Sequence, residues 1–449
     1  MNGLITRWGA LHASARWYLV HVALLTLSQT SVGLFFNVAI LAYGHQRAEL
    51  GQLNLVAIWA SVVFSLPLWW LVTRLGFRRA LLIHGACQAL AIAVYAAAVP
   101  LPVLFGAAGI AGAASVLFQV SAPPLMMHYS DGDTRDMLFS ASTGVTIIVA
   151  GIGSLLAGAM PAVFGRALGV GAESGAAYQA TFAVAALGML LALLPLLAMA
   201  NDAPSQEPPA RSPQSGAPSQ KPPVRSQNVK SIIQNSKLKT QNLKLRMMLP
   251  VLALLISPAC VSVGAALLIP YLNLFFKQQF GVPNALLGAI FALLDISTGV
   301  AVLLGPLLST RWGKLPTVVL TQLLSIPFLL VMGFSPLLGV AVGAAALRSA
   351  LFNLGRPLYD AFAMERTAEA ARPMVIGLMG GAATVGYLFM PAVSVYVQAN
   401  YGFGPLFLAT AACYALSTVV IVILFMLPAR LARAGWYNSA DSQGSKEDV

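Results

Sequence analysis

Residues 73–79 read Thr-Arg-Leu-Gly-Phe-Arg-Arg, and residues 310–314 read Thr-Arg-Trp-Gly-Lys. Each of these short basic stretches follows one long apolar run and precedes another. Such a stretch, with glycine at its centre, is typical of a tight turn between two helices. The two copies lie 237 residues apart, measured from Arg74 to Arg311, which indicates that a unit of the chain occurs twice.

The composition identifies the solvent around most of the chain. The chain has 449 residues, of which 58% are hydrophobic and 9% charged, and the mean hydropathy is +0.79. Soluble domains carry roughly 25% charged residues, so water cannot be the solvent of most of this surface. In lipid only helices or closed barrels satisfy the backbone, and the long, non-alternating apolar runs favour helices. We therefore expect an all-α integral membrane protein.

Twelve apolar stretches are long enough to cross a bilayer, for which a helix needs about 20 residues. They form two groups of six. The predicted spans are residues 17–43, 52–73, 80–99, 102–127, 138–164, 177–200, 248–276, 284–309, 315–334, 337–360, 373–398 and 403–428.

The spans divide the chain into four regions. Residues 1–200 are expected to form an N-terminal six-helix bundle, and residues 247–430 a C-terminal one. Between them, residues 201–246 are rich in Pro, Ser, Gln and Lys, which predicts a disordered basic linker. Residues 431–449 are expected to be a tail.

The distribution of Lys and Arg predicts the orientation. With both termini in the cytoplasm, 22 of the 26 Lys and Arg lie on the cytoplasmic side and three on the other. This bias is typical of a multi-pass protein of the plasma membrane, in a bacterium the inner membrane. The formal charge of +12 is therefore explained by topology, and we expect no nucleic-acid partner.

The two halves share four short matches in the same order, at separations of 230 to 237 residues. Besides the basic turns, Asn37 matches Asn273, Met160-Pro161 matches Met390-Pro391, and Pro124 matches Pro357. Four ordered matches favour duplication over chance. Repeated halves in a membrane protein predict a transporter with a binding site between them near the midplane.

Two groups of six predicted helices are joined by a long basic linker, and a basic glycine turn follows the second and the eighth helix. This arrangement resembles the major facilitator superfamily. Thr73 and Thr310 stand where the family's turn pattern has Asp. The resemblance implies twelve helices in two pseudo-symmetric bundles and alternating access. It also implies a gating role for the matching residues, which are Arg74, Gly76, Arg78, Arg79, Arg311, Gly313 and Lys314.

Further charges recur at the cytoplasmic ends of the fourth and tenth spans. Mixed signs there favour ion pairs that form and break between the halves. A solvated loop with weak surface pairs is the alternative. The candidate gating residues are Asp131, Arg135, Glu365, Arg366 and Arg372.

Asp295 and Arg348 are the charges predicted to lie deepest. Each stands about eleven residues into its span, roughly 16 Å deep. Charges at that depth usually face the bundle interior and pair. We expect an Asp295–Arg348 pair, or an Asp295 that exchanges a proton, with a static structural pair as the alternative.

Four amides are candidate solute-binding residues. They can bind a polar solute without a charge, or they can bond each other or a helix backbone across the interface. These residues are Asn37, Asn273, Gln29 and Gln119.

The fifth span is rich in glycine, including Gly151 and Gly158. It loosely resembles the family's antiporter motif, although it lacks the adjacent Gly-Pro pair. Glycines also let helices pack closely, so both interpretations remain open.

The expected function is proton-driven efflux of a small hydrophobic or weakly polar solute by a monomer in membrane lipid. Uptake of a small metabolite is one alternative, and a non-transporting membrane sensor on a transporter fold is another. No phosphate-binding loop, His/Cys cluster or Gly-x-Ser-x-Gly nucleophile motif occurs, so we expect no enzyme activity, metal or cofactor.

Overall fold

A computed structural model describes residues 12–131, 134–199, 251–367 and 372–427. Over these residues the chain is helical and has no strand. The predicted linker of residues 201–246 and the predicted tail lie outside the described ranges, so both stay predictions.

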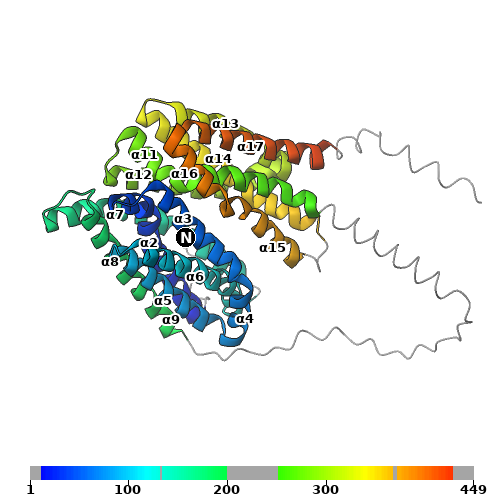
Figure 1. The fold of residues 1–449 in the computed structure, drawn as a ribbon. Coiled ribbons are helices and arrows are strands. Elements are labelled where there is room, and N and C mark those ends of the chain that lie inside the picture. Colours follow the sequence, from blue (N-terminus) through cyan, green and yellow to red (C-terminus); the bar gives the residue numbers. More distant parts are fainter. Residues whose placement is uncertain (1–11, 132–133, 200–250, 368–371, 428–449) are drawn as a thin grey trace, which may run out of the picture.

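The first half forms one bundle (Figure 1). Its helices are α2 (Ala13–Ala42), α3 (Arg47–Val63), α4 (Ser65–Leu75), α5 (Phe77–Ala96), α6 (Leu101–His128), α7 (Arg135–Leu168), α8 (Gly175–Leu191) and α9 (Leu193–Ala198).

The second half forms the other bundle and starts with a helix at residues 251–268. It continues with η1 (Ile269–Tyr271), α11 (Leu272–Phe280), α12 (Asn284–Trp312), α13 (Lys314–Phe334), α14 (Leu338–Glu365), α15 (Arg372–Ala382), η3 (Val385–Leu388), α16 (Met390–Tyr401), α17 (Gly404–Ile421) and the π-helical η4 (Val422–Met426).

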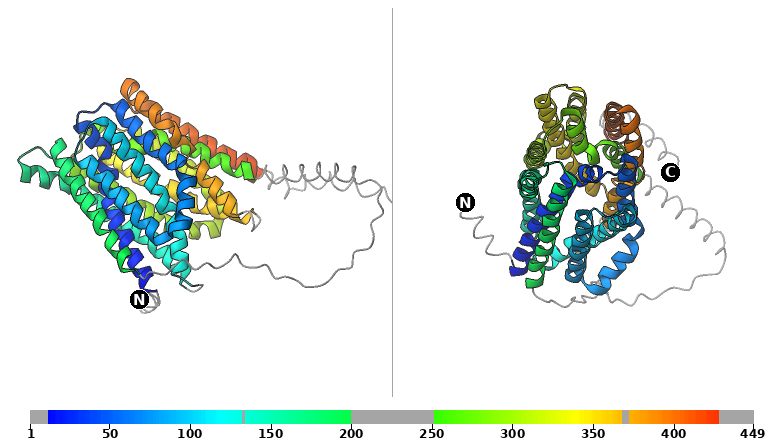
Figure 2. Two further views of the ribbon diagram at one scale, coloured as in Figure 1. Left: turned by 60° about the horizontal axis from the view of Figure 1, so that its bottom comes forward. Right: turned by 60° about the vertical axis from the view of Figure 1, so that its left-hand side comes forward.

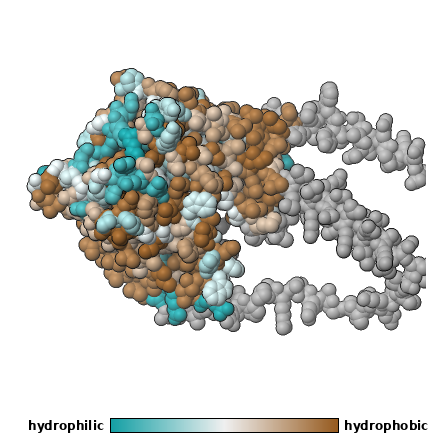
Figure 3. Space-filling view, in the orientation of Figure 1, coloured by the Kyte–Doolittle hydropathy of each residue, from teal (hydrophilic) through white to brown (hydrophobic). Residues whose placement is uncertain are grey.

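Ten helices in the described ranges are long and apolar enough to cross a membrane, and the bent pair α3–α4 gives an eleventh if it is counted as one span. The remaining predicted span, the eleventh in chain order (residues 373–398), falls on α15, η3 and α16, which together run from residue 372 to 401. Large apolar side chains face outward along the helices; Leu303 is 78% exposed and Leu66 77%. Apolar surface covers the bodies of both bundles, and hydrophilic residues gather near α11 (Figure 3). This surface fits a multi-pass membrane protein.

Two spans are broken where the bundles meet. The α3–α4 pair bends by 56° at Phe64, and the eleventh span is interrupted by η3. The indole Nε1 of Trp59 donates a hydrogen bond to the carbonyl oxygen of Leu388 at 3.1 Å, and the Trp59 ring packs edge-on against Phe389. The broken span of the first bundle therefore contacts the broken span of the second directly, through the Trp59 side chain.

The predicted basic turns are one residue long. Gly76 alone separates α4 from α5, and Gly313 alone separates α12 from α13. Their φ angles are +83° and +86°, in the left-handed region that favours glycine. The same geometry at equivalent positions supports the duplication. We call the end of the molecule that carries these turns the motif end, and the end with the α2–α3 and α11–α12 connections the far end.

The bundles meet mainly along α7 with α12 and along α3 with α16, and Figure 2 shows both bundles from two further sides. The helix axes approach closely at Gly158 and Gly288. A Cβ on Gly288 would lie 2.3 Å from the carbonyl oxygen of Ser154 and 2.7 Å from the Cα of Gly158. Gly151 and Gly158 of the fifth span thus pack against the other bundle, which supports the packing interpretation of these two residues.

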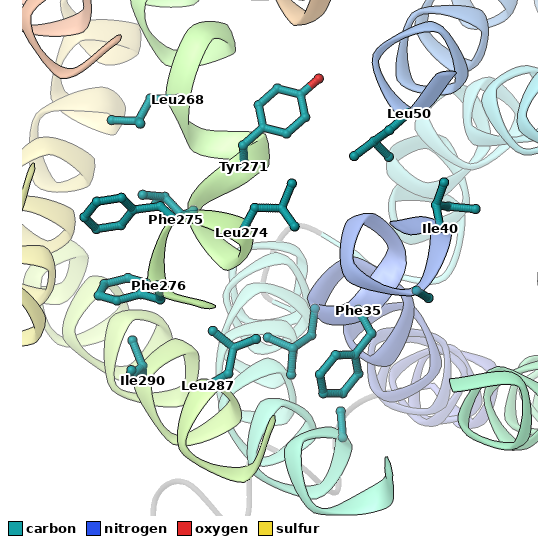
Figure 4. Packing of buried hydrophobic residues seen from close by; sticks show 14 of the residues in the cluster. Phe35, Ile40, Leu50, Leu268, Tyr271, Leu274, Phe275, Phe276, Leu287 and Ile290 are labelled. Carbon is teal, nitrogen blue, oxygen red and sulfur yellow. The ribbon is translucent and has the colours of Figure 1, made fainter. Parts of the chain in front are cut away.

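A hydrophobic cluster closes the far end between the bundles (Figure 4). It joins Phe35, Ile40 and Leu50 of the first half to Tyr271 and Phe275 of the second. All five side chains are almost fully buried. The far end is therefore packed shut in this conformation.

Candidate functional site

The larger of the two described cavities has a volume of about 790 Å³ and is lined by residues of the second bundle, from Ser257 to Ile421. Its lining includes Gln322 and Tyr414, and also Met364 beside the last residue of α14. The cavity therefore extends toward the motif end, opposite the packed far end.

Asp295 connects this cavity to the other bundle. It lies in the middle of α12, lines the cavity, and accepts a hydrogen bond from Ser154 Oγ of α7 at 3.1 Å. Ser154 is 2% exposed, and its carbonyl lies at the Gly158–Gly288 crossing. A change at the Asp295 carboxyl can thus reach the contact between the bundles.

Arg348 lines the same cavity from the middle of α14 and is 6% exposed. Its Nη2 donates a hydrogen bond to Tyr414 Oη at 2.5 Å. The guanidinium carbon lies 5.0 Å from the ring centroid of Phe352 and 5.5 Å from that of Tyr414. Aromatic rings and a phenol therefore hold the cation in place.

The expected Asp295–Arg348 ion pair is absent. The ion pairs between described residues, with nitrogen and oxygen at most 4.0 Å apart, do not include these two. The physical reason is that each side chain takes a partner on a third helix, Ser154 on α7 for Asp295 and Tyr414 on α17 for Arg348. Both residues lie within long apolar helices as predicted, but the predicted contact between them is wrong.

Asn37 and Asn273 bond each other between the bundles. Asn37 Nδ2 donates to Asn273 Oδ1 at 3.1 Å and to the carbonyl oxygen of Pro270 at 2.5 Å. Asn273 Nδ2 donates to the carbonyl oxygen of Leu34 at 2.9 Å, and both amides are buried. Of the two roles open to these amides, this conformation uses the structural one.

The other two amides lie elsewhere. Gln29 is exposed and lines a smaller cavity of about 320 Å³ in the first bundle, beside Thr26, Thr30 and Thr146. Gln119 is exposed and lies outside the lining of both cavities. A solute-binding role remains a prediction for both residues.

The candidate gating residues of the second bundle contact that bundle in this conformation. Lys314 forms an ion pair with Glu365, and the Arg366 guanidinium lies 5.0 Å from the Phe362 ring centroid. Arg311 is exposed.

The candidate gating residues of the first bundle likewise contact their own bundle. Arg78 donates to the carbonyl oxygens of Leu196 and Leu197 at the end of α9. The Arg74 guanidinium lies 5.0 Å from the Trp70 ring centroid, and Asp131 bonds Thr134. Arg79 is exposed, and the side chains of Arg135 and Arg372 lie outside the described part. Exchange of these contacts for pairs between the bundles remains a prediction.

Several residues of the cavity were not found from the sequence. Gln322 and Asn353 are polar residues inside apolar runs, and a polar residue in a membrane span is by itself a sign of a functional position. Phe352 and Arg356 follow Arg348 at spacings of four, which places them near one face of α14. Tyr414 and Ser154 gave no such signal, because what matters is their contact with a residue far away in the sequence.

The comparisons with known proteins bear on this architecture. A model of the Major Facilitator Superfamily matches residues 19–293 and 254–436. The chain belongs to the major facilitator superfamily. It is thus a multi-pass membrane transporter of this family, and its solute is a small molecule.

Among curated proteins, sugar efflux transporter A of Escherichia coli (strain K12) is 25% identical over 171 residues. The match covers 37% of this chain and 43% of that protein, so the chain spans less than half of the relative's length in this match.

Solved structures share the fold at low identity. The nucleoside transporter NupG has a TM-score of 0.66 at 12% identity, over 92% of this chain and 99% of that one. A D-xylose-proton symporter has a TM-score of 0.65 at 13% identity, over 91% and 96%. A bacterial homologue of the lysosomal transporter Spinster, in an inward-facing and unoccupied conformation, has a TM-score of 0.63 at 14% identity, over 93% and 95%.

Proposed function

We propose that this family member moves a small solute through the cavity of the second bundle by proton-driven alternating access, in the direction of efflux. The observation that carries the proposal is the double contact of Asp295. Its carboxyl lines the cavity and also bonds Ser154 of the other bundle. One group is then in reach of both the solute and the surface along which the bundles move.

The chemistry of Asp295 suits this role. An ionised carboxylate inside the membrane is costly, and such residues mark ion pathways and proton relays. A proton on Asp295 removes its charge and changes how it accepts the Ser154 hydroxyl. Binding of the proton would thus favour one arrangement of α7 against α12 over the other, as a coupled equilibrium requires.

The proposed direction, efflux, rests on the partial similarity to the sugar efflux transporter. The first solutes to test are chosen from the similarity to known sugar and nucleoside transporters. Proteoliposomes should be assayed with labelled lactose, D-xylose and uridine under an imposed pH gradient. In intact cells, expression should lower the accumulation of a transported label. Higher accumulation would instead establish uptake.

Asp295→Asn tests the coupling. We expect this variant to lose flux driven by the pH gradient while it keeps solute exchange at equal pH, because exchange needs no net proton movement. Glu49→Gln, which changes a carboxylate at the start of α3, is the matched control and should behave as wild type. Gradient-driven flux that survives in Asp295→Asn would remove Asp295 from the mechanism. Solute-dependent quenching of tryptophan fluorescence without flux would favour the alternative of a non-transporting membrane sensor.

A further inference from the structure

Arg348 lacks a counter-charge. Among the described residues, the ion pairs within 4.0 Å include no carboxylate partner for its guanidinium. Asp295 is bonded to Ser154 instead, and Glu365 is paired with Lys314. The Nε atom of Arg348 is buried and has no hydrogen-bond partner.

This arrangement is expensive for the protein alone. Arginine keeps its charge at every accessible pH, and a buried charge is costly unless it is paired. The contacts with the Phe352 and Tyr414 rings offset only a small part of that cost. A cation held at 6% exposure on a cavity wall is therefore a site that an anion would complete.

The number of cations limits the charge of that anion. The next arginine on the cavity wall is Arg356, eight residues or roughly 12 Å further along α14, with Asp360 one turn beyond it. One planar guanidinium fork matches one carboxylate, whereas a phosphate dianion calls for a second cation close by. A single carboxylate fits best.

Two amides indicate what else the solute carries. Gln322 Nε2 donates to the carbonyl oxygen of Tyr414 at 3.3 Å, and Asn353 Nδ2 donates to the carbonyl oxygen of Ser349 at 2.9 Å. Both residues line the cavity. One N–H of each side chain is taken by a backbone carbonyl. Among the described residues neither amide oxygen has a hydrogen-bond partner, and an amide oxygen accepts from hydroxyl groups.

We propose that the solute is a small hydroxycarboxylic acid, whose single carboxylate binds Arg348 and whose hydroxyl groups donate to Gln322 and Asn353. The inference rests on the transport function proposed above and names the class of its solute. Tyr414 and Phe352 are positioning residues that hold the guanidinium in place.

The test uses an acid and its neutral isostere. Binding of D-gluconate and D-gluconamide to the purified full chain is measured by calorimetry, and flux of both in proteoliposomes. Wild type should prefer the acid by at least about tenfold, since a hydrogen bond to a charged group contributes about 1.5–3 kcal/mol. Arg348→Gln should bring the ratio close to one. Arg348→Lys should leave an intermediate ratio, since lysine keeps the charge but not the fork.

Arg166→Gln is the matched control. Arg166 lies in the last turn of α7, where it bonds its own helix, and the ratio should not change. Equal affinity for acid and amide in wild type would overturn the inference, as would no binding of either, or an unchanged ratio in a folded Arg348→Gln protein. Flux of neutral sugars without acid flux would overturn it and leave the transport function standing. Acid-selective binding without flux of any solute would support the site and reject the transport function.

Discussion

Asn37 of the first bundle donates a hydrogen bond to Asn273 of the second at 3.1 Å, and the two residues hold equivalent places in the duplicated halves. Asn54 Nδ2 adds a bond to Asn37 Oδ1 at 3.4 Å. Duplication has thus placed the same amide on both sides of the far end, where the two side chains now close one interface. The far end can open only when these bonds break.

Asn37→Ala should therefore open the far end more often. A hydrogen bond between neutral groups contributes about 0.5–1.5 kcal/mol, so we expect about two- to twelvefold faster labelling of a buried far-end cysteine. The reporter is Leu274→Cys, which replaces a side chain only 2% exposed, in a background with Cys87, Cys260 and Cys413 changed to serine. A membrane-impermeant thiol reagent gives the rate. Asn400→Ala, which removes a bond within one helix, is the control. Equal labelling rates in the two variants would contradict the role of the amide pair.

Gly288→Ala should drive α7 and α12 apart. The added Cβ would lie 2.3 Å from a backbone oxygen, and overpacking of this kind costs about 1–3 kcal/mol. We expect a lower thermal midpoint in detergent and impaired transport, because that oxygen belongs to Ser154, whose hydroxyl bonds Asp295. Gly144→Ala on α7, where a Cβ meets open space, should leave the midpoint unchanged or raise it, since alanine favours helix. The prediction is wrong if both variants melt alike.

Trp59→Phe should weaken the contact between the two broken spans. The substitution keeps an aromatic ring against Phe389 but leaves the Leu388 carbonyl without its donor. We expect a loss of about 0.5–1.5 kcal/mol in stability and slower transport. Thermal unfolding and the proteoliposome rate measure the two effects. Trp69→Phe, at a side chain 55% exposed on α4, serves as the control. A rate equal to that of the control would show that the contact has no part in the cycle.

The positions of the spans could be predicted because an apolar run of 20 residues is a local property of the sequence. The predicted eighth span, residues 284–309, lies within α12 (Asn284–Trp312). The duplication also located Gly76 and Gly313 correctly as the two turns. Their common φ explains why glycine stands at both positions.

The partners inside the bundles could not be predicted. A helix that is apolar on every side carries little sign of which face points inward. Asp295 and Arg348 therefore looked like partners for each other, although Ser154 lies 141 residues from Asp295 and Tyr414 lies 66 residues from Arg348. The break of the eleventh span was missed for a related reason. Met160-Pro161 lies inside the continuous α7, whereas Met390-Pro391 begins α16 after a break.

The single-residue turn at Gly76 has a mechanical consequence. Because one residue joins α4 to α5, the angle between these two helices can change little. The other end of α4 is the bend at Phe64, where α4 meets α3. The eleven residues of α4, roughly 16 Å long, thus form a rigid segment between this bend and the turn at Gly76. Arg78, in the first turn of α5, donates to the carbonyl oxygens of Leu196 and Leu197 near the end of α9. We therefore expect a displacement of α4 to move α9 as well, which would couple the second span to the sixth.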